Sequence, residues 1–144
     1  MIFHGDSLIV DSASDVSITG SDGYEGYYSK AFNRLVSGTQ GADGLQLSSG
    51  SLTVHSDAKL TITGGNGGNS TDTGVSSGDG GNALSFDGMY YSVASNAKVT
   101  FNAGTAGSIT SDTSSDKSGS DGKILSYTNG LFQDQNLLKS ALSD

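Results

Sequence analysis

One block of alternating side chains occurs three times in this chain, and it constrains the fold more than any other feature. The copies are SLIVDSASDVSITG from Ser7, SLTVHSDAKLTITG from Ser51 and YYSVASNAKVTFNA from Tyr90. Alternation with a period of two is typical of β-strands that bury one face. The predicted inward columns are Leu8, Leu52 and Tyr91; Val10, Val54 and Val93; Val16, Leu60 and Val99; and Ile18, Ile62 and Phe101.

Small residues lie in the middle of each block, which predicts two short strands joined by a tight turn. A further short strand follows in every repeat, LQL at 45–47, LSF at 84–86 and LSY at 125–127. Its last residue always lies five positions before the first core residue of the next block, as Leu47 does before Leu52 and Phe3 does before Leu8. We therefore predict three strands in each repeat.

All variation in repeat length lies in one segment, between the block and the following LxL strand. Leu8 and Leu52 are 44 residues apart, whereas Leu52 and Tyr91 are 39 apart. Stacked coils need their core residues in register, while a surface loop can change length at little entropic cost. We expect the three loops to leave the same edge of the stack and to form one surface, where binding usually resides.

The pattern resembles the right-handed β-helix repeats of bacterial surface and secreted proteins, including adhesin passenger domains and polysaccharide-acting enzymes. The resemblance implies an all-β chain, a right-handed parallel β-helix (β-solenoid) of about three coils with long loops on one edge. The predicted repeats are 8–51, 52–90 and 91–131, within a repeat region of 1–132. Residues 133–144, QDQNLLKSALSD, have leucines at helical spacing and are predicted to form a short helical cap.

Charge and composition exclude several functions. The formal net charge is −8 with only seven Lys and Arg, which is unsuited to phosphate or to an anionic membrane surface. No apolar run approaches the ~20 residues of a membrane span. With 33% hydrophobic residues, the core is small for this length, so we expect a longer repeat protein or a homo-oligomer.

The first loop differs from the other two, because it concentrates aromatic residues. It contains Tyr24, Tyr27, Tyr28 and Phe32 beside the only Glu and the only Arg of the chain. Aromatic rings stack on sugar rings, and polar groups bind sugar hydroxyls. The predicted ligand-binding residues are Tyr24, Glu25, Tyr27, Tyr28 and Arg34. The favoured structural alternative is a short amphipathic helix, in which Tyr28, Phe32 and Leu35 cover the coil stack.

Other patterns favour other functions less strongly. Thr61 and Thr63, with the hydroxyl-rich columns around them, resemble the Thr-x-Thr ladders of ice-binding solenoids. The sequences GADG, GDGG and GSDG have calcium binding as one interpretation, but we favour turns in which glycine has a positive φ. No catalytic constellation occurs, and no cofactor is expected.

The sequence therefore predicts an extracellular or cell-surface adhesion module that binds a glycan or a host receptor, with no nucleic acid and no membrane insertion. The alternatives are a structural stalk or spacer, a self-associating module of a larger surface or phage fibre protein, and an ice-binding solenoid.

Overall fold

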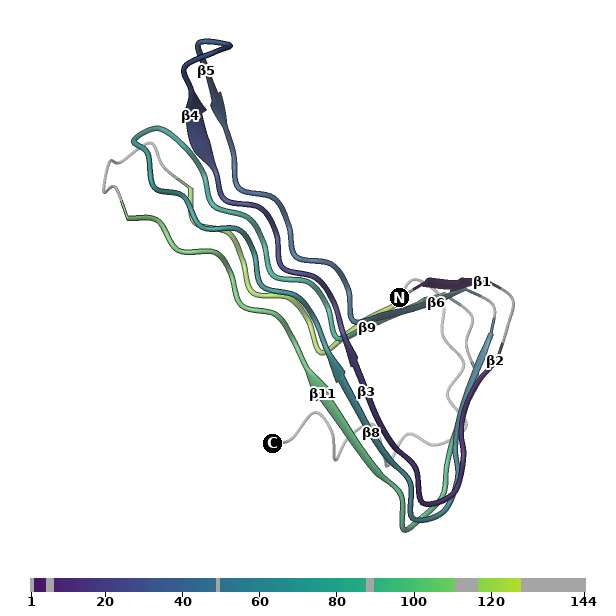
Figure 1. Ribbon diagram of the computed structural model, residues 1–144. Coiled ribbons are helices and arrows are strands. Elements are labelled where there is room, and N and C mark those ends of the chain that lie inside the picture. Colours follow the sequence, from purple (N-terminus) through teal and green to yellow (C-terminus); the bar gives the residue numbers. More distant parts are fainter. Residues whose placement is uncertain (1, 5–6, 49, 88–89, 111–116, 128–144) are drawn as a thin grey trace.

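The computed structural model describes residues 2–4, 7–48, 50–87, 90–110 and 117–127. Within these ranges the chain is all-β and contains no helix. The predicted cap at 133–144 lies outside the described residues. Two parts can be distinguished in Figure 1, a body of stacked strands that is triangular in projection and a set of long arms that extend from one corner.

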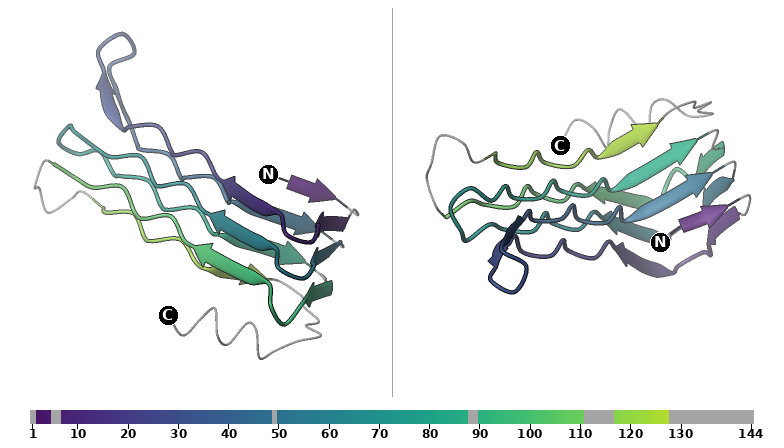
Figure 2. Two further views of the ribbon diagram at one scale, coloured as in Figure 1. Left: turned by 60° about the horizontal axis from the view of Figure 1, so that its bottom comes forward. Right: turned by 90° about the horizontal axis from the view of Figure 1, so that it is seen from above.

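Three parallel sheets build the body, and each contains one strand from every repeat (Figures 1 and 2). The first sheet has the order β1-β6-β9-β12, the second β10-β7-β2 and the third β11-β8-β3. The strands are β1 (Ile2–His4), β2 (Ser7–Val10), β3 (Asp15–Thr19), β6 (Leu45–Ser48), β7 (Ser51–Val54), β8 (Lys59–Thr63), β9 (Leu84–Asp87), β10 (Tyr90–Val93), β11 (Lys98–Asn102) and β12 (Leu125–Tyr127).

The register of these sheets confirms the predicted columns. Leu8, Leu52 and Tyr91 are Cα partners across the second sheet. Ile18, Ile62 and Phe101 are partners across the third. Their side chains, with those of the LxL strands, form one continuous apolar core, and it is driest in the middle repeat. The core residues of that repeat with 0–1% exposure are Leu52, Val54, Leu60, Ile62, Ala83 and Leu84.

A tight turn separates the two strands of each block, as the small residues predicted. β2 and β3 belong to different sheets, as do β7 and β8. The turn places Ala13 and Asp57 in the left-handed region, with φ of 60° and 58°. Successive turns are joined by backbone hydrogen bonds, such as that from the Lys59 N–H to the Ser14 carbonyl at 2.7 Å. The corner therefore stacks in register with the strands on either side of it.

Three arms replace the loops that the sequence predicted. The first arm is residues 20–44, the second 64–83 and the third 103–124, of which 111–116 lie outside the described residues. Each arm has an outgoing segment that leaves the body and a return segment that runs back to it (Figure 2). The arms lie side by side, which confirms that they leave the same edge of the stack.

Within an arm, the backbone repeats every three residues. Gly20 donates its N–H to the carbonyl of Thr63, the last residue of β8, at 2.9 Å. Gly23 and Gly26 donate theirs to the Asn66 and Asn69 carbonyls of the second arm, at 2.8 and 2.7 Å. A three-residue turn is the period of the polyproline II helix, which has no internal hydrogen bonds and leaves its backbone groups to outside partners. The outgoing segments thus bond to one another, as do the return segments.

A second set of hydrogen bonds joins the outgoing layer to the return layer. The Gly68 N–H donates to the Thr39 carbonyl at 2.9 Å, and the Gly78 N–H donates to the Gly68 carbonyl at 2.8 Å. The arms are therefore a two-layer bundle of extended segments, held by main-chain bonds and not by an apolar core.

Close backbone approach explains the glycines of the arms. A Cβ built on Gly65 lies 2.0 Å from the Ser21 carbonyl oxygen, and one on Gly68 lies 1.8 Å from the Tyr24 carbonyl oxygen. Among the described glycines only Gly74 has a positive φ, so the prediction of positive-φ turn glycines was wrong. The glycines are required because another backbone occupies the place of their side chain.

A segment with neighbours on both sides has more glycines per turn than a segment at the end of the bundle. The second arm, with neighbours on both sides, reads GGNGGN at 64–69. The first arm, at the end of the bundle, reads GSDGYE at 20–25. Ser21 and Tyr24 stand where Gly65 and Gly68 stand in the next repeat, and both of their side chains are exposed. The end position thus permits a large side chain at Tyr24.

Candidate functional site

The first arm ends in an antiparallel β-hairpin, not in the amphipathic helix that the sequence favoured. β4 (Tyr27–Ser29) pairs with β5 (Arg34–Val36) in the register Tyr27 to Val36, Tyr28 to Leu35 and Ser29 to Arg34. Residues 30–33 form the turn, in which Asn33 has a φ of 47°. The helical spacing of Tyr28, Phe32 and Leu35 misled the prediction, because the same residues also suit two short strands joined by a turn.

The hairpin projects beyond the second arm (Figures 1 and 2). The hairpin and Tyr24, which precedes it, carry most of the exposed aromatic side chains of the described residues. Tyr24 is 82% exposed, Phe32 75%, Tyr27 50% and Tyr28 40%. Leu35 is also exposed. Rings that pack against the body would be buried, so the proposed cover of the coil stack is excluded. We call the side chains of Tyr24, Tyr27, Tyr28, Phe32 and Leu35 the aromatic tip.

Contacts to the second arm hold the base of the hairpin in place. The Tyr28 N–H donates to the Asp72 carboxylate at 2.6 Å. Val75 is fully buried beside Gly26, and Leu35 lies against Gly74. The buried Ser70 hydroxyl donates to the Val75 carbonyl at 2.6 Å. The hairpin thus stands on a packed second arm, which orders its strands.

Two contacts within the hairpin orient its side chains. The Tyr28 hydroxyl donates to the Asn33 side-chain oxygen. The Arg34 guanidinium lies over the Phe32 ring, 5.7 Å from the ring centroid, in a cation–π geometry. Arg34 therefore supports a ring and also offers N–H donors to the solvent. Phe32 was not among the ligand-binding residues predicted from the sequence.

The structure brings the predicted site residues to one end of the first arm but divides them between two faces. Tyr27 and Arg34 lie on one face of the hairpin, and Tyr28 lies on the other with Leu35, since successive strand residues point to opposite sides. Tyr24 and Glu25 precede the hairpin on the outgoing segment. A single small ligand cannot contact Tyr27 and Tyr28 equally.

Apart from the aromatic tip, a polar surface covers the outgoing segments. Every third residue points outward there, and these side chains form ladders across the repeats. Asp22 accepts the Asn66 N–H at 2.7 Å, and Asn66 in turn accepts the Thr105 N–H at 3.0 Å. The ladders border a furrow of about 360 Å³, lined by Asp22, Gly23, Glu25, Asn66, Gly67, Gly68, Asn69, Thr105 and Ala106.

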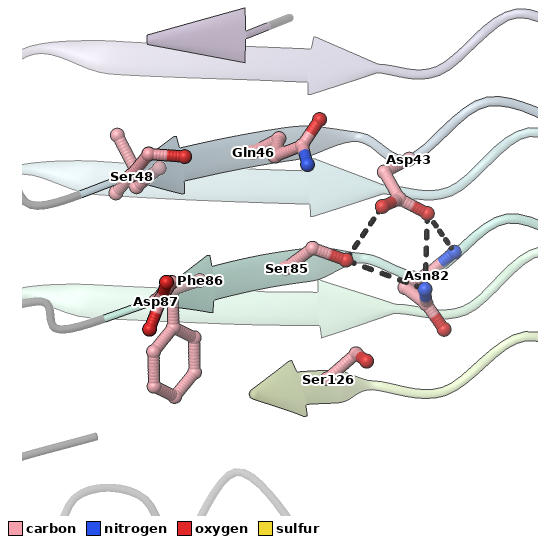
Figure 3. A pocket seen from close by; sticks show the side chains of 9 residues that line it. Asp43, Gln46, Ser48, Asn82, Ser85, Phe86, Asp87 and Ser126 are labelled. Atoms are coloured by element: carbon pink, nitrogen blue, oxygen red, sulfur yellow. Dashed lines mark hydrogen bonds between the residues drawn. The ribbon is translucent and has the colours of Figure 1, made fainter. Parts of the chain in front are cut away.

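Another polar surface lies where the return segments enter the first sheet (Figure 3). It is a depression of about 300 Å³. The Asp43 carboxylate accepts the Asn82 N–H at 2.8 Å and the Ser85 hydroxyl at 2.5 Å. Gln46 and Ser126 lie in register with Ser85 on the same face. Both Asp43 oxygens are thus engaged by the protein itself.

In the Asp-Gly sequences for which calcium binding was one interpretation, the aspartates accept hydrogen bonds within the arm bundle. Asp79 accepts the Ser120 N–H, and Asp121 accepts the Ala106 N–H, each at 2.7 Å. Among the described residues, no group of three or more His, Asp or Glu side chains is placed to hold a metal ion. The aspartates therefore have a structural use.

Comparison with known proteins adds no assignment, because no family model, curated protein or solved structure matches this chain. In the part of the chain that the structure describes, no helix has the length and apolar character of a membrane span.

Proposed function

We propose that the chain is a cell-surface adhesion module of the β-solenoid class, which binds a glycan through the aromatic tip of the first arm. One observation carries the proposal. Four aromatic side chains are exposed at the end of an ordered projection, while the core residues of the same chain are buried. Exposed aromatic rings cost free energy in water, and their concentration at one place is typical of a binding site.

The chemistry of the tip supports a sugar ligand. A Tyr or Phe ring offers a flat apolar face that matches the C–H face of a pyranose. Polar groups lie beside the rings, with the Arg34 guanidinium over Phe32 and the Asn33 amide against the Tyr28 hydroxyl. Glu25 adds a carboxylate at the base of the tip. Such a mixture of rings, donors and acceptors is usual in carbohydrate sites.

The architecture supports a role in presenting a ligand-binding surface. Parallel strands in register form a body with a continuous core, and the arm bundle carries the hairpin away from it (Figure 1). Loops on an ordered scaffold are common binding elements. An adhesion module acts outside the cell, so the proposal includes an extracellular or cell-surface location.

A glycan array followed by calorimetric titration tests the proposal. We expect the intact chain to retain at least one glycan, and Tyr24→Ala to weaken it at least about tenfold, the usual loss at an aromatic hot spot. Because the Tyr24 side chain is 82% exposed, its removal should leave the fold intact. Phe32→Ala should act in the same direction.

Tyr90→Ala is the matched control, since Tyr90 is an exposed tyrosine on β10 in the body. It should leave affinity unchanged. Failure of the intact chain to retain any glycan contradicts the proposal and favours a structural spacer. Thermal hysteresis in cold solution would instead support the ice-binding alternative.

A further inference from the structure

The furrow on the outgoing segments has walls of polar side chains and a floor of backbone. Its walls are two ladders, one through Asp22, Asn66 and Thr105 and the other through Glu25, Asn69 and Ser108. Three residues separate the ladders along each segment, which is about 9.3 Å at the rise of a polyproline II helix. Gly23 and Gly67 contribute no side chain between them, so the furrow stays open.

The ladders fix which atoms the two asparagines present to the furrow. The Asn69 side-chain oxygen accepts the Ser108 N–H at 2.9 Å and its hydroxyl at 3.0 Å. The Asn66 oxygen is engaged in the same way by Thr105. A backbone N–H can only donate, so the oxygen of each amide must face it and the NH2 group must face away. No described residue accepts a hydrogen bond from either NH2 group.

Acceptors lie on the first-arm side of the same furrow. Asp22 uses one carboxylate oxygen for the Asn66 N–H and keeps the other. The Glu25 carboxylate makes no hydrogen bond or ion pair with any described residue, so the bond made by Asp22 is not repeated one turn further along. The furrow thus presents unused donors and unused acceptors within one turn of each other. The depression beside Asp43 differs, since its carboxylate is already engaged on both oxygens.

We infer that the furrow is a second saccharide subsite, which selects uncharged sugar residues. The inference rests on the proposed function in taking a glycan as the ligand. Neighbouring sugar hydroxyls both donate and accept, as the paired amides and carboxylates require. A uronic or sialic acid carries a carboxylate, which Asp22 and Glu25 repel, and no cationic side chain lines the furrow to offset this. The net charge of −8 acts in the same direction.

The position of the furrow makes it continuous with the aromatic tip. Gly23 and Glu25 line the furrow, and Tyr24 lies between them in the sequence with its ring exposed. A linear oligosaccharide that stacks on Tyr24 can therefore extend into the furrow. The tip supplies ring contacts, and the furrow selects by charge and hydroxyl pattern.

Asn66→Asp combined with Asn69→Asp tests the inference without breaking the ladders. Aspartate keeps an oxygen to accept the Thr105 and Ser108 N–H groups but replaces each NH2 donor with a charged acceptor. The probes are maltopentaose, cellopentaose, mannopentaose, trigalacturonic acid and sialyllactose, titrated by calorimetry into the folded chain. We expect the neutral sugar that binds best to lose about tenfold or more in affinity in the double variant.

Gln40→Glu is the charge control, because Gln40 is exposed on a return segment and is not among the furrow residues. It should change affinity less than twofold per added charge. We further expect the acidic sugars to bind the unmodified chain at least tenfold more weakly than the best neutral sugar.

The outcomes separate this inference from the proposed function. If Tyr24→Ala weakens binding while the double variant does not, or if acidic sugars bind best, the furrow inference is wrong and glycan binding at the tip stands. If the double variant weakens binding while Tyr24→Ala does not, the tip is wrong as the site and the furrow inference stands. If no sugar binds the unmodified chain, both are wrong.

Discussion

Successive repeats are stacked in both the body and the arms of this protein, but different interactions align them. In the body, successive repeats are aligned by columns of apolar side chains, such as Val16, Leu60 and Val99. In the arms, successive segments are aligned by backbone hydrogen bonds, and glycine allows them to approach. One part therefore depends on buried side chains, and the other on the absence of side chains.

This contrast explains how a chain with few hydrophobic residues forms an ordered structure. The core needs only the strand residues that face inward, and they are grouped in the three repeated blocks and the short LxL strands. The arms satisfy their backbone polar groups through neighbouring segments, so they do not need a core to remain extended. The described glycines of the arms, apart from Gly74, are thus required by close backbone packing.

The largest expected effect comes from the body. Leu60→Ala should lower the free energy of unfolding by about 2–5 kcal/mol, because it opens a cavity in the fully buried middle repeat. Thermal or urea unfolding followed by circular dichroism measures the loss. Leu60→Met nearly conserves the volume and should cost less than about 1.5 kcal/mol. Equal losses in the two variants would mean that packing at Leu60 does not hold the repeats together.

The next largest effect should arise in the arms. Gly65→Ala places a Cβ within 2.0 Å of the Ser21 carbonyl oxygen, so the first and second arms must separate locally. We expect a loss of about 1–3 kcal/mol, typical of overpacking, and faster hydrogen exchange in the arms than in the body.

Ser21→Ala is the matched control for this glycine, since Ser21 occupies the same place at the exposed end of the bundle. It should leave both stability and hydrogen exchange nearly unchanged. If Gly65→Ala behaved like Ser21→Ala, close backbone packing would not be the reason for the glycines.

Much of the body could be predicted from the sequence, because period-two alternation and the constant spacing of Leu47 before Leu52 specify strands and register together. The arms could not be predicted with the same rules. Their signal was present, as glycine at 20, 23 and 26 and the sequence GGNGGN, but its period of three has no apolar residue to mark it. Turns were predicted because glycine readily adopts a positive φ. In the arms, glycine is instead required because a neighbouring backbone fills the space beside it.

The position of the candidate site was predicted in part. The concentration of aromatic residues in the first loop identified the residues that now lie at the aromatic tip. Their exposure could not be deduced, because Tyr28, Phe32 and Leu35 fit an amphipathic helix as well as a hairpin. The furrow was missed entirely, since the side-chain pairing of Asn66 with Thr105 appears only once the three-residue period is known.

A smaller effect is expected from the side-chain ladders of the arms. Asp79→Ala removes the acceptor of the Ser120 N–H, a hydrogen bond of 2.7 Å, and should cost about 0.5–1.5 kcal/mol. Asp79→Asn keeps an acceptor at the same place and should cost less. Hydrogen exchange at Ser120 reports the local bond. Unchanged protection in Asp79→Ala would show that main-chain bonds alone order the arms.

The smallest effect should come from the charged outer face of the body, where Lys59 pairs with Asp15 at 3.1 Å. Both side chains are more than half exposed, at 52% and 66%, so solvent and salt screen the pair. Lys98 lies beside Lys59 in the register, and its like charge opposes the attraction.

A double-mutant cycle with Asp15→Asn and Lys59→Gln should give a coupling of about 0.2–1 kcal/mol at low salt and less at 1 M salt. Because Lys98→Gln removes the repulsion, it should leave stability unchanged or raise it slightly. A coupling as large as the loss in Leu60→Ala would instead show that charge pairs, and not apolar columns, set the register of the body.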